Sequence, residues 1–397
     1  MKKRLVVCCD GTWNRPDSTN ITNIEKIART IQTDPAECGG VQQQVLYLSG
    51  VGSAGYAADR LLGGAFGFGL FDNVRSGYRF LALNYNPGDE VFVFGFSRGA
   101  YTARSLVGMI GRVGLLTRES LIADQLPEAV DRYRRRRPTR SSFHGSSDQR
   151  FREVHSHPDL SVTFLGVFDT VGALGVPGAF VHSHQFHDVQ LSSTVQCARQ
   201  ALAVDEHRMK FEPSLWEAAT EADLPADEDP RVRQTWFEGA HSDVGGGYDE
   251  TGLSDTALGW MTKEAMQHGL VFDERLLYTY LGSGSPARRH DSRTTAYKLL
   301  NLGSRVRLAL RPPEGGPRFR GHERILDRPL AIGVRVASAT ATHYLEDEAD
   351  HRRQEKADSL ARRPAEPREW YHPGNLREVA ERTIGFRTGV EQVVGKP

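Results

Sequence analysis

A serine between two glycines carries the clearest chemical signal in this sequence. The pentapeptide Gly95–Gly99 reads Gly-Phe-Ser-Arg-Gly and ends the apolar, β-favouring run Glu90–Phe96. A helix-like stretch follows, so Ser97 lies in the strand–turn–helix context that is typical of a nucleophile elbow. Glycines in such a turn let the strand and the helix cross closely, and the helix N-terminus offers N–H groups to a developing oxyanion. The pattern predicts that Ser97 is a nucleophile.

A serine nucleophile needs a base, and the base needs an acid that orients it. Asp169 directly follows the apolar run Ser161–Phe168, and His241 directly follows the run Thr235–Ala240. Because the carboxyl ends of parallel strands meet at one edge of a sheet, these side chains are expected near Ser97. We therefore predict a Ser97–Asp169–His241 triad.

Alternatives exist for both partners of the serine. Asp243 competes for the acid role, or else hydrogen-bonds the loop backbone and positions His241. His207, His343 and His372 are weaker candidates for the base, because none directly follows a convincing strand.

Two backbone N–H groups are expected to form the oxyanion hole. One belongs to Arg98, the residue after the nucleophile. The other belongs to Gly11 or Thr12, in the loop that follows the strand-like run Arg4–Cys9. Asp10 opens this loop and is predicted to support the site. Its alternative is the aspartyl nucleophile of a phosphatase, whose motif expects a second aspartate where this chain has Thr12.

Strand-like and helix-like runs alternate along the chain, which predicts an α/β fold. The strand-like runs are continuously apolar, as in strands buried on both faces. We expect an α/β-hydrolase-like, mostly parallel sheet with helices on both faces and inserted cap segments. The predicted strands are Arg4–Cys9, Val45–Ser49, Glu90–Phe96, Ser161–Phe168, Thr235–Ala240 and, more weakly, Ala296–Leu302. The predicted helices are Asn23–Thr30, Phe71–Asn84, Ala100–Arg112, Ile122–Arg136, Ser193–Asp205 and Ser254–His268.

The domain organisation is expected to be simple. A catalytic domain is predicted over residues 1–310, with an insertion around 113–160, and a C-terminal extension over 311–397 is predicted to pack on it. The glycine-rich, apolar segment Gly50–Gly69 and the stretch Ile122–His157 of the insertion are predicted to cover the site. Arginines in this insertion would then meet a phosphate or carboxylate near its mouth; they are Arg132 and Arg134–Arg137.

Composition narrows the classes of partner. The formal net charge of the 397 residues is zero, so no global field attracts nucleic acid, and we predict no nucleic-acid partner. The four cysteines have neither metal-type spacing nor the density of a disulfide framework, and we expect no metal and no cofactor.

No stretch approaches the ~20 apolar residues of a membrane span, and the run after Lys2–Arg4 is too short for a signal peptide. We expect a cytoplasmic chain, whose export would use a route that needs no signal peptide.

Seven ordered motifs resemble those of the DUF2235 family, an α/β-hydrolase-like domain that includes the catalytic part of Tle1-type phospholipase effectors of type VI secretion. The motifs are Cys9–Asn14, Gly63–Gly67, Asn84–Glu90, Gly95–Arg104, Val167–Gly172, Ala203–Glu206 and Gly239–Tyr248. The resemblance covers about residues 4–270, and Tyr371–Leu376 echoes the family's tail.

This resemblance implies a serine hydrolase that cleaves carboxylic esters through an acyl-enzyme intermediate, with Ser97, Asp169 and His241 at the matching motif positions. The implied substrate is a small-molecule or lipid ester, phospholipids included, with transient contact with a membrane surface. The alternative is a hydrolase fold retained as a binding or scaffold module without turnover.

Overall fold

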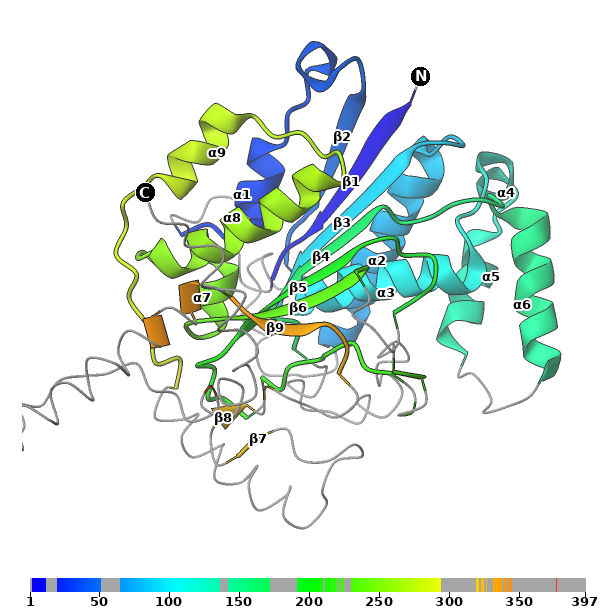
Figure 1. The fold of residues 1–397 in the computed structure, drawn as a ribbon. Coiled ribbons are helices and arrows are strands. Elements are labelled where there is room, and N and C mark those ends of the chain that lie inside the picture. Colours follow the sequence, from blue (N-terminus) through cyan, green and yellow to red (C-terminus); the bar gives the residue numbers. More distant parts are fainter. Residues whose placement is uncertain are drawn as a thin grey trace, which may run out of the picture.

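The computed structural model (Figure 1) describes most of the chain that precedes residue 294 and short pieces after it. The described residues are 2–11, 20–50, 65–135, 142–171 and 191–293 except 210, 219, 221–222 and 225–229, then 319–320, 323–324, 326, 331–337, 339–340, 343–344 and 376. Side chains of 65–70, 142–146, 319–320 and 323 are not described.

A parallel sheet forms the centre of the molecule, with strand order β2-β1-β3-β4-β5-β6-β9. Its strands are β1 (Lys3–Cys9), β2 (Gln42–Leu48), β3 (Glu90–Phe96), β4 (Phe164–Phe168), β5 (Ala198–Ala203), β6 (Val232–Phe237) and β9 (Val334–Val336). All six pairings are parallel. The chain order reverses between β1 and β3, and such switch points open a crevice at the carboxyl edge of a sheet. The predicted α/β fold is confirmed.

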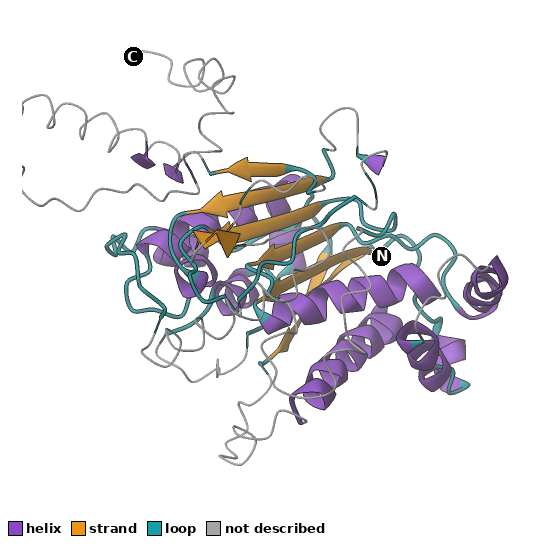
Figure 2. Ribbon diagram, turned by 90° about the horizontal axis from the view of Figure 1, so that it is seen from below, coloured by secondary structure: helices purple, strands orange, loops and turns teal. Residues whose placement is uncertain are grey.

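Helices cover both faces of this sheet (Figures 1 and 2). On one face lie α1 (Asn23–Thr30), α8 (Gly252–Gln267) and α9 (Glu274–Leu281), packed on alternate side chains of β1 and β3 such as Val6 and Phe94. On the other lie α2 (Ala65–Asn84) and α3 (Arg98–Val113), packed on the intervening side chains such as Val7 and Val93. This alternation follows from the two-residue period of a strand.

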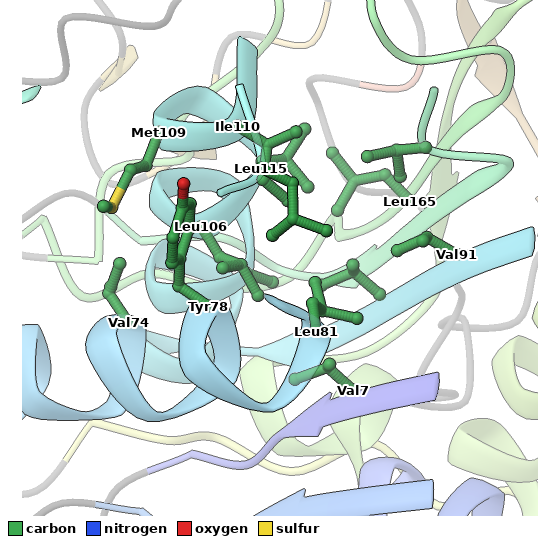
Figure 3. Close-up of a cluster of buried hydrophobic side chains, with 14 of the residues drawn as sticks. Val7, Val74, Tyr78, Leu81, Val91, Leu106, Met109, Ile110, Leu115 and Leu165 are labelled. Carbon is green, nitrogen blue, oxygen red and sulfur yellow. The ribbon is translucent and has the colours of Figure 1, made fainter. Parts of the chain in front are cut away.

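The core between the sheet and α2 and α3 is shown in Figure 3. Tyr78 of α2 is fully buried there, and its hydroxyl donates to Gly114 O (2.8 Å) and accepts from Leu116 N (3.0 Å). A buried hydroxyl is tolerated only with such partners. Tyr78 therefore fixes the point where the chain leaves α3 and enters the insertion.

The insertion contains α4 (Arg118–Ile122), α5 (Leu126–Arg134) and α6 (Ser142–His155). Its arginines mainly join its own parts: Arg132 pairs with Glu128 (2.8 Å) and Asp148 (3.3 Å), and Asp148 also pairs with Arg112 of α3 (3.0 Å). Arg134 lies over the ring of Phe71, 5.0 Å from its centroid. These contacts place the insertion against α2 and α3. Its covering of the site stays a prediction, and residues 51–64 of the glycine-rich segment and 136–141 lie outside the described residues.

Two predicted elements differ in the structure. The expected helix Ser193–Asp205 is wrong: Ala198–Ala203 is β5, fully buried between β4 and β6. The segment is rich in Ala, Leu, Arg and Gln, which favour helix, and sheet pairing overrides that preference. The expected helix Ile122–Arg136 starts later, as α5 at Leu126, because Ile122 ends α4 and the chain turns at Asp124, whose φ is 55°. The weak strand Ala296–Leu302 lies outside the described residues.

Residues beyond 310 complete the sheet. β9 pairs with β6, and Leu326, Tyr344 and Leu376 pack in one buried cluster with Trp236 of β6. Residues Phe319–Arg320 (β7) and Glu323–Arg324 (β8) form a short antiparallel pair. The extension thus contributes a strand as well as packing on the core; the boundary at 310 falls outside the described residues and stays a prediction.

Candidate active site

Ser97 occupies the turn between β3 and α3 in a strained conformation. Its φ of 57° and ψ of −119° are unfavourable for a residue with a Cβ atom. Its N–H donates to Phe168 O at the end of β4 (3.1 Å), which ties the turn to the neighbouring strand. Strain of this kind persists only where the surrounding structure enforces it, and it gathers at functional sites.

The two glycines of the pentapeptide are required by close backbone approach. A Cβ on Gly99 would lie 2.1 Å from Cys9 O and 2.5 Å from Asp10 O, and one on Gly95 would lie 2.5 Å from Gly99 O. Any side chain at either position would push α3 away from β1 and β3. The first turn of α3, with the N–H of Arg98, is thereby held against the end of β1.

Asp169 and His241 form a hydrogen-bonded pair at the carboxyl edge, beside the turn. His241 Nδ1 lies 2.6 Å from Asp169 Oδ2, and both side chains are buried. An ionised carboxylate only accepts hydrogen bonds, so the hydrogen of a neutral His241 is on Nδ1. That tautomer leaves Nε2 with a lone pair able to accept a proton.

Asp169 is held ionised by an arginine from the C-terminal part of the chain. Arg324 donates from Nη1 to Oδ1 (2.6 Å) and from Nη2 to Oδ2 (3.1 Å), and Ala203 N donates to Oδ1 (3.0 Å). Burial raises the pKa of Asp169, but the charge of Arg324 and the bonds from His241 and Arg324 outweigh burial and hold this pKa well below its usual range. Asp169 also has a positive φ, 34°.

His241 begins the short helix α7 (His241–Gly245) and lies between two aromatic rings. The ring of Phe96, the residue before the serine, is 4.7 Å from the imidazole centroid, and that of Phe211 is 5.0 Å away in an edge-on contact. Gly245 allows α7 to lie on Phe96, since a Cβ there would be 2.0 Å from the ring. The imidazole is therefore fixed from three sides.

The hydrogen bonds of the described residues include none between Ser97 Oγ and His241 Nε2. Catalytic hydrogen bonds are often long in unliganded enzymes and shorten in the substrate complex. Ser97, Asp169 and His241 thus follow three strands at one edge of the sheet, and Asp169 and His241 are hydrogen-bonded to each other. The complete triad stays a prediction.

Asp243 bonds elsewhere. Its Oδ2 accepts from Ala240 N (2.9 Å) and His290 N (3.0 Å), and its Oδ1 lies 2.6 Å from His290 Nδ1. Asp243 therefore caps the start of α7, which agrees with the alternative that it hydrogen-bonds the backbone and positions His241. The carboxylate that bonds to His241 is that of Asp169. Among the other histidines, His343 Nδ1 bonds Glu238 (2.7 Å) and His372 lies outside the described residues.

Asp10 is buried just after β1 and accepts hydrogen bonds that hold the start of the loop that follows. Its Oδ1 accepts from Gly11 N (2.6 Å), and its Oδ2 accepts from Thr22 Oγ1 (2.7 Å) and Tyr47 Oη (2.6 Å). Burial and the Asp10 charge raise the pKa of Tyr47, which keeps its hydroxyl a donor. The Gly11 N–H is thus engaged by Asp10. Thr12 lies outside the described residues, and the second oxyanion donor stays a prediction.

Glu206 and Arg324 are site residues that the sequence prediction missed. Glu206 is fully buried; its Oε2 accepts from His241 N (3.3 Å), and Arg208 donates to both of its oxygens (2.9 and 2.7 Å). Burial raises the pKa of Glu206, but Arg208, then Arg324 and His241, bring it below its usual value. Glu206 lies in a motif quoted above, three residues past β5, whereas no local pattern marks Arg324.

No metal or membrane feature accompanies the site in the part of the chain that the structure describes. No group of three or more His, Cys, Asp or Glu side chains there is arranged to hold a metal ion. Within the same ranges, none of the helices has the length and apolar character needed to cross a membrane.

A parallel sheet with a strained serine at a strand–helix turn, beside an acid–histidine pair, defines an α/β-hydrolase-like domain. Residues 3–264 match the family described as T6SS phospholipase effector Tle1-like, catalytic domain. Because the match spans more than half of the 397 residues, the chain belongs to this family. The predicted family is confirmed.

Individual relatives are more distant. An uncharacterized protein of Saccharomyces cerevisiae is 30% identical over 228 residues, which are 53% of this chain and 32% of that protein. An uncharacterized protein from Pseudomonas aeruginosa of known structure is 15% identical, with a TM-score of 0.40, over 97% of this chain and 62% of that one. The Tle1 effector solved bound to the VgrG spike of the type 6 secretion system is 19% identical, with a TM-score of 0.37, over 63% and 52%. The chain thus spans about a third of the curated relative that it matches.

Proposed function

We propose that this chain is a serine hydrolase that cleaves carboxylic esters of lipids, phospholipids included. One observation carries the proposal: the strained Ser97 lies at the sheet edge where Asp169 and His241 are bonded at 2.6 Å. The lipid substrate rests on the family, whose description names a phospholipase effector.

The proposed reaction has two halves. Ser97 Oγ attacks the ester carbonyl carbon while His241 Nε2 takes the hydroxyl proton, and the resulting oxyanion accepts hydrogen bonds that include one from Arg98 N–H. Collapse breaks the carbon–oxygen bond of the ester, and His241 gives its proton to the leaving alkoxide. Water, deprotonated by His241, then attacks the acyl carbon. The bond from this carbon to Ser97 Oγ breaks, His241 returns the proton to Ser97 Oγ, and the carboxylic acid leaves. Asp169 holds the imidazole throughout and stabilises its protonated form.

Covalent labelling tests the nucleophile. A fluorophosphonate probe should label wild type at Ser97, and Ser97→Ala should abolish both labelling and hydrolysis of p-nitrophenyl esters, because losing a nucleophile typically costs several orders of magnitude in rate. Ser120→Ala is the matched control, since Ser120 is 7% exposed against 8% for Ser97 and lies in the insertion. Retention of more than about a tenth of wild-type turnover in Ser97→Ala would place catalysis elsewhere.

The substrate class is tested separately. Wild type is assayed on p-nitrophenyl esters of increasing chain length and on phosphatidylcholine vesicles, with release of fatty acid as the readout. Cleavage of the vesicles supports a lipid esterase. Cleavage of short soluble esters alone would overturn the lipid part of the proposal, and absence of both turnover and labelling would favour a binding module without catalysis.

A further inference from the structure

We infer that Arg324 is a positioning residue for the proposed hydrolysis, acting through Asp169, so that the catalytic unit extends beyond the family's matched segment. The inference rests on the proposed function. Arg324 lies 60 residues after residue 264, where the family match ends, and 155 residues after Asp169.

The guanidinium of Arg324 contacts several parts of the site at once. Nη1 donates to Asp169 Oδ1 and to Ala203 O (2.6 and 2.9 Å), and Nη2 donates to Asp169 Oδ2 (3.1 Å) and to Phe211 O. Ala203 ends β5, and the ring of Phe211 lies against His241. The guanidinium of Arg324 therefore holds three groups in position: the Asp169 carboxylate, the end of β5 at Ala203, and Phe211, whose ring lies against the imidazole.

The fork geometry fixes where the carboxylate points. Two nearly parallel bonds from an arginine define both the plane and the direction of a carboxylate, which a point charge such as lysine cannot do. With its position so defined, Asp169 Oδ2 reaches His241 Nδ1. Arg324 thus acts on the imidazole through the carboxylate and does not need to touch substrate.

The charges explain why such a residue is required. Asp169 and Arg324 are both fully buried, and a carboxylate buried alone would take up a proton instead of staying ionised. A protonated Asp169 could donate a hydrogen bond as well as accept one, so the tautomer of His241 would no longer be set. Net stability is a weaker account, because a buried ion pair contributes little overall compared with apolar packing.

The test compares three full-length variants. Arg324→Gln removes the charge, and Arg324→Lys keeps the charge without the fork. Arg199→Gln is the matched control, because Arg199 is 3% exposed and paired with Glu264 but lies four residues before the end of β5. Steady-state kinetics on a p-nitrophenyl ester from pH 4 to 9 gives kcat and KM, and thermal unfolding gives Tm.

We expect Arg324→Gln to lower kcat by about 100-fold, as expected for a misplaced catalytic group, with little change in KM. Its kcat should also decline toward acid pH more steeply than that of wild type, since burial raises the pKa of an Asp169 that has lost its ion-pair partner. Arg324→Lys should recover part of kcat and part of the wild-type pH profile at acid pH. Arg199→Gln should lower Tm and leave kcat unchanged. An Arg324→Gln protein with wild-type kcat and pH profile would overturn the inference.

A double variant separates positioning from a structural role. In the Asp169→Asn background, Arg324→Gln should cause no further loss of kcat, because the residue through which it acts is already altered. A further loss of similar size would mean that Arg324 acts by another route. If wild type is inactive and unlabelled at Ser97, the proposed function fails. If wild type is active and Arg324→Gln equals it, only this inference fails.

Discussion

Asp243 and His290 form a second carboxylate–histidine pair, with 2.6 Å between Asp243 Oδ1 and His290 Nδ1. His290 also stacks on Tyr248, with ring centroids 4.0 Å apart, and its Nε2 lies 3.3 Å from Glu250. The pair ties residue 290 to the start of α7 and so holds the turn that presents His241. His241 and Asp243 are thus two residues apart in sequence but belong to different pairs. His241 pairs with Asp169, and Asp243 pairs with His290.

The two carboxylates are expected to respond differently to amide substitution. Asp169→Asn should lower kcat by about 10⁴-fold, because the amide favours the wrong tautomer of His241. Asp243→Asn should lower the free energy of unfolding by about 1–3 kcal/mol, through loss of charged hydrogen bonds, and kcat by less than about tenfold. Ester kinetics and chemical denaturation of both variants measure this. The reverse ranking in kcat would make Asp243 the triad acid.

Ser97→Gly is expected to be at least as stable as Ser97→Ala. Glycine adopts a φ of 57° with a ψ of −119° without a Cβ clash, and relief of such strain is worth roughly 1–3 kcal/mol, against about 0.5–1 kcal/mol for the greater chain entropy of unfolded glycine. Denaturation midpoints of the two inactive variants give the comparison. A markedly less stable glycine variant would show that the turn imposes no strain on residue 97.

Gly99→Ala should disrupt the nucleophile turn. Its Cβ would lie 2.1 Å from a backbone carbonyl of β1, and overpacking of this kind costs about 1–3 kcal/mol or more. Activity should fall together with Tm, since α3 must move. Gly259→Ala in α8 is the control: its Cβ would meet only Leu281, at 3.6 Å, and alanine favours helix by about 1 kcal/mol. Equal effects of the two substitutions would contradict the close approach.

The low pKa of Asp169 predicts a pH dependence of stability. A carboxylate whose pKa is depressed by folding stabilises the native state above its unfolded pKa, about 3.9, and loses this contribution as pH falls. The difference in unfolding free energy between wild type and Asp169→Asn should therefore be constant from about pH 5 to 7 and shrink below about pH 4. Denaturant titrations at each pH measure it. A difference that grows toward acid pH would mean that burial dominates and Asp169 is protonated when folded.

The parts of the fold with strong local patterns could be predicted from sequence. β3 and α1 occur at the predicted residues, and the turn glycines flank a strained serine as the pentapeptide indicates. Each depends on neighbours in sequence: an apolar run, a capping threonine at Thr22, or a Gly-x-Ser-x-Gly spacing.

The parts decided by distant residues could not be predicted. Ala198–Ala203 has helix-favouring composition and becomes a strand only because β4 and β6 pair with it. Arg324 lies in a charged segment without periodicity, and its partner is 155 residues away. Asp169 is the predicted acid and Asp243 its alternative, and the choice between them depends on which carboxylate the fold brings to His241.

The sequence separation of Asp169 and Arg324 has a consequence for biosynthesis. At a translation rate of about 5–20 residues per second, the ribosome adds the 155 residues between them in roughly 8–30 seconds. During that interval a nascent chain that buries Asp169 lacks the Arg324 guanidinium that compensates its charge. The acid–histidine pair therefore matures after translation has passed Arg324, and a ribosome that stalls earlier leaves a chain with its serine turn but without the ion pair that sets its acid.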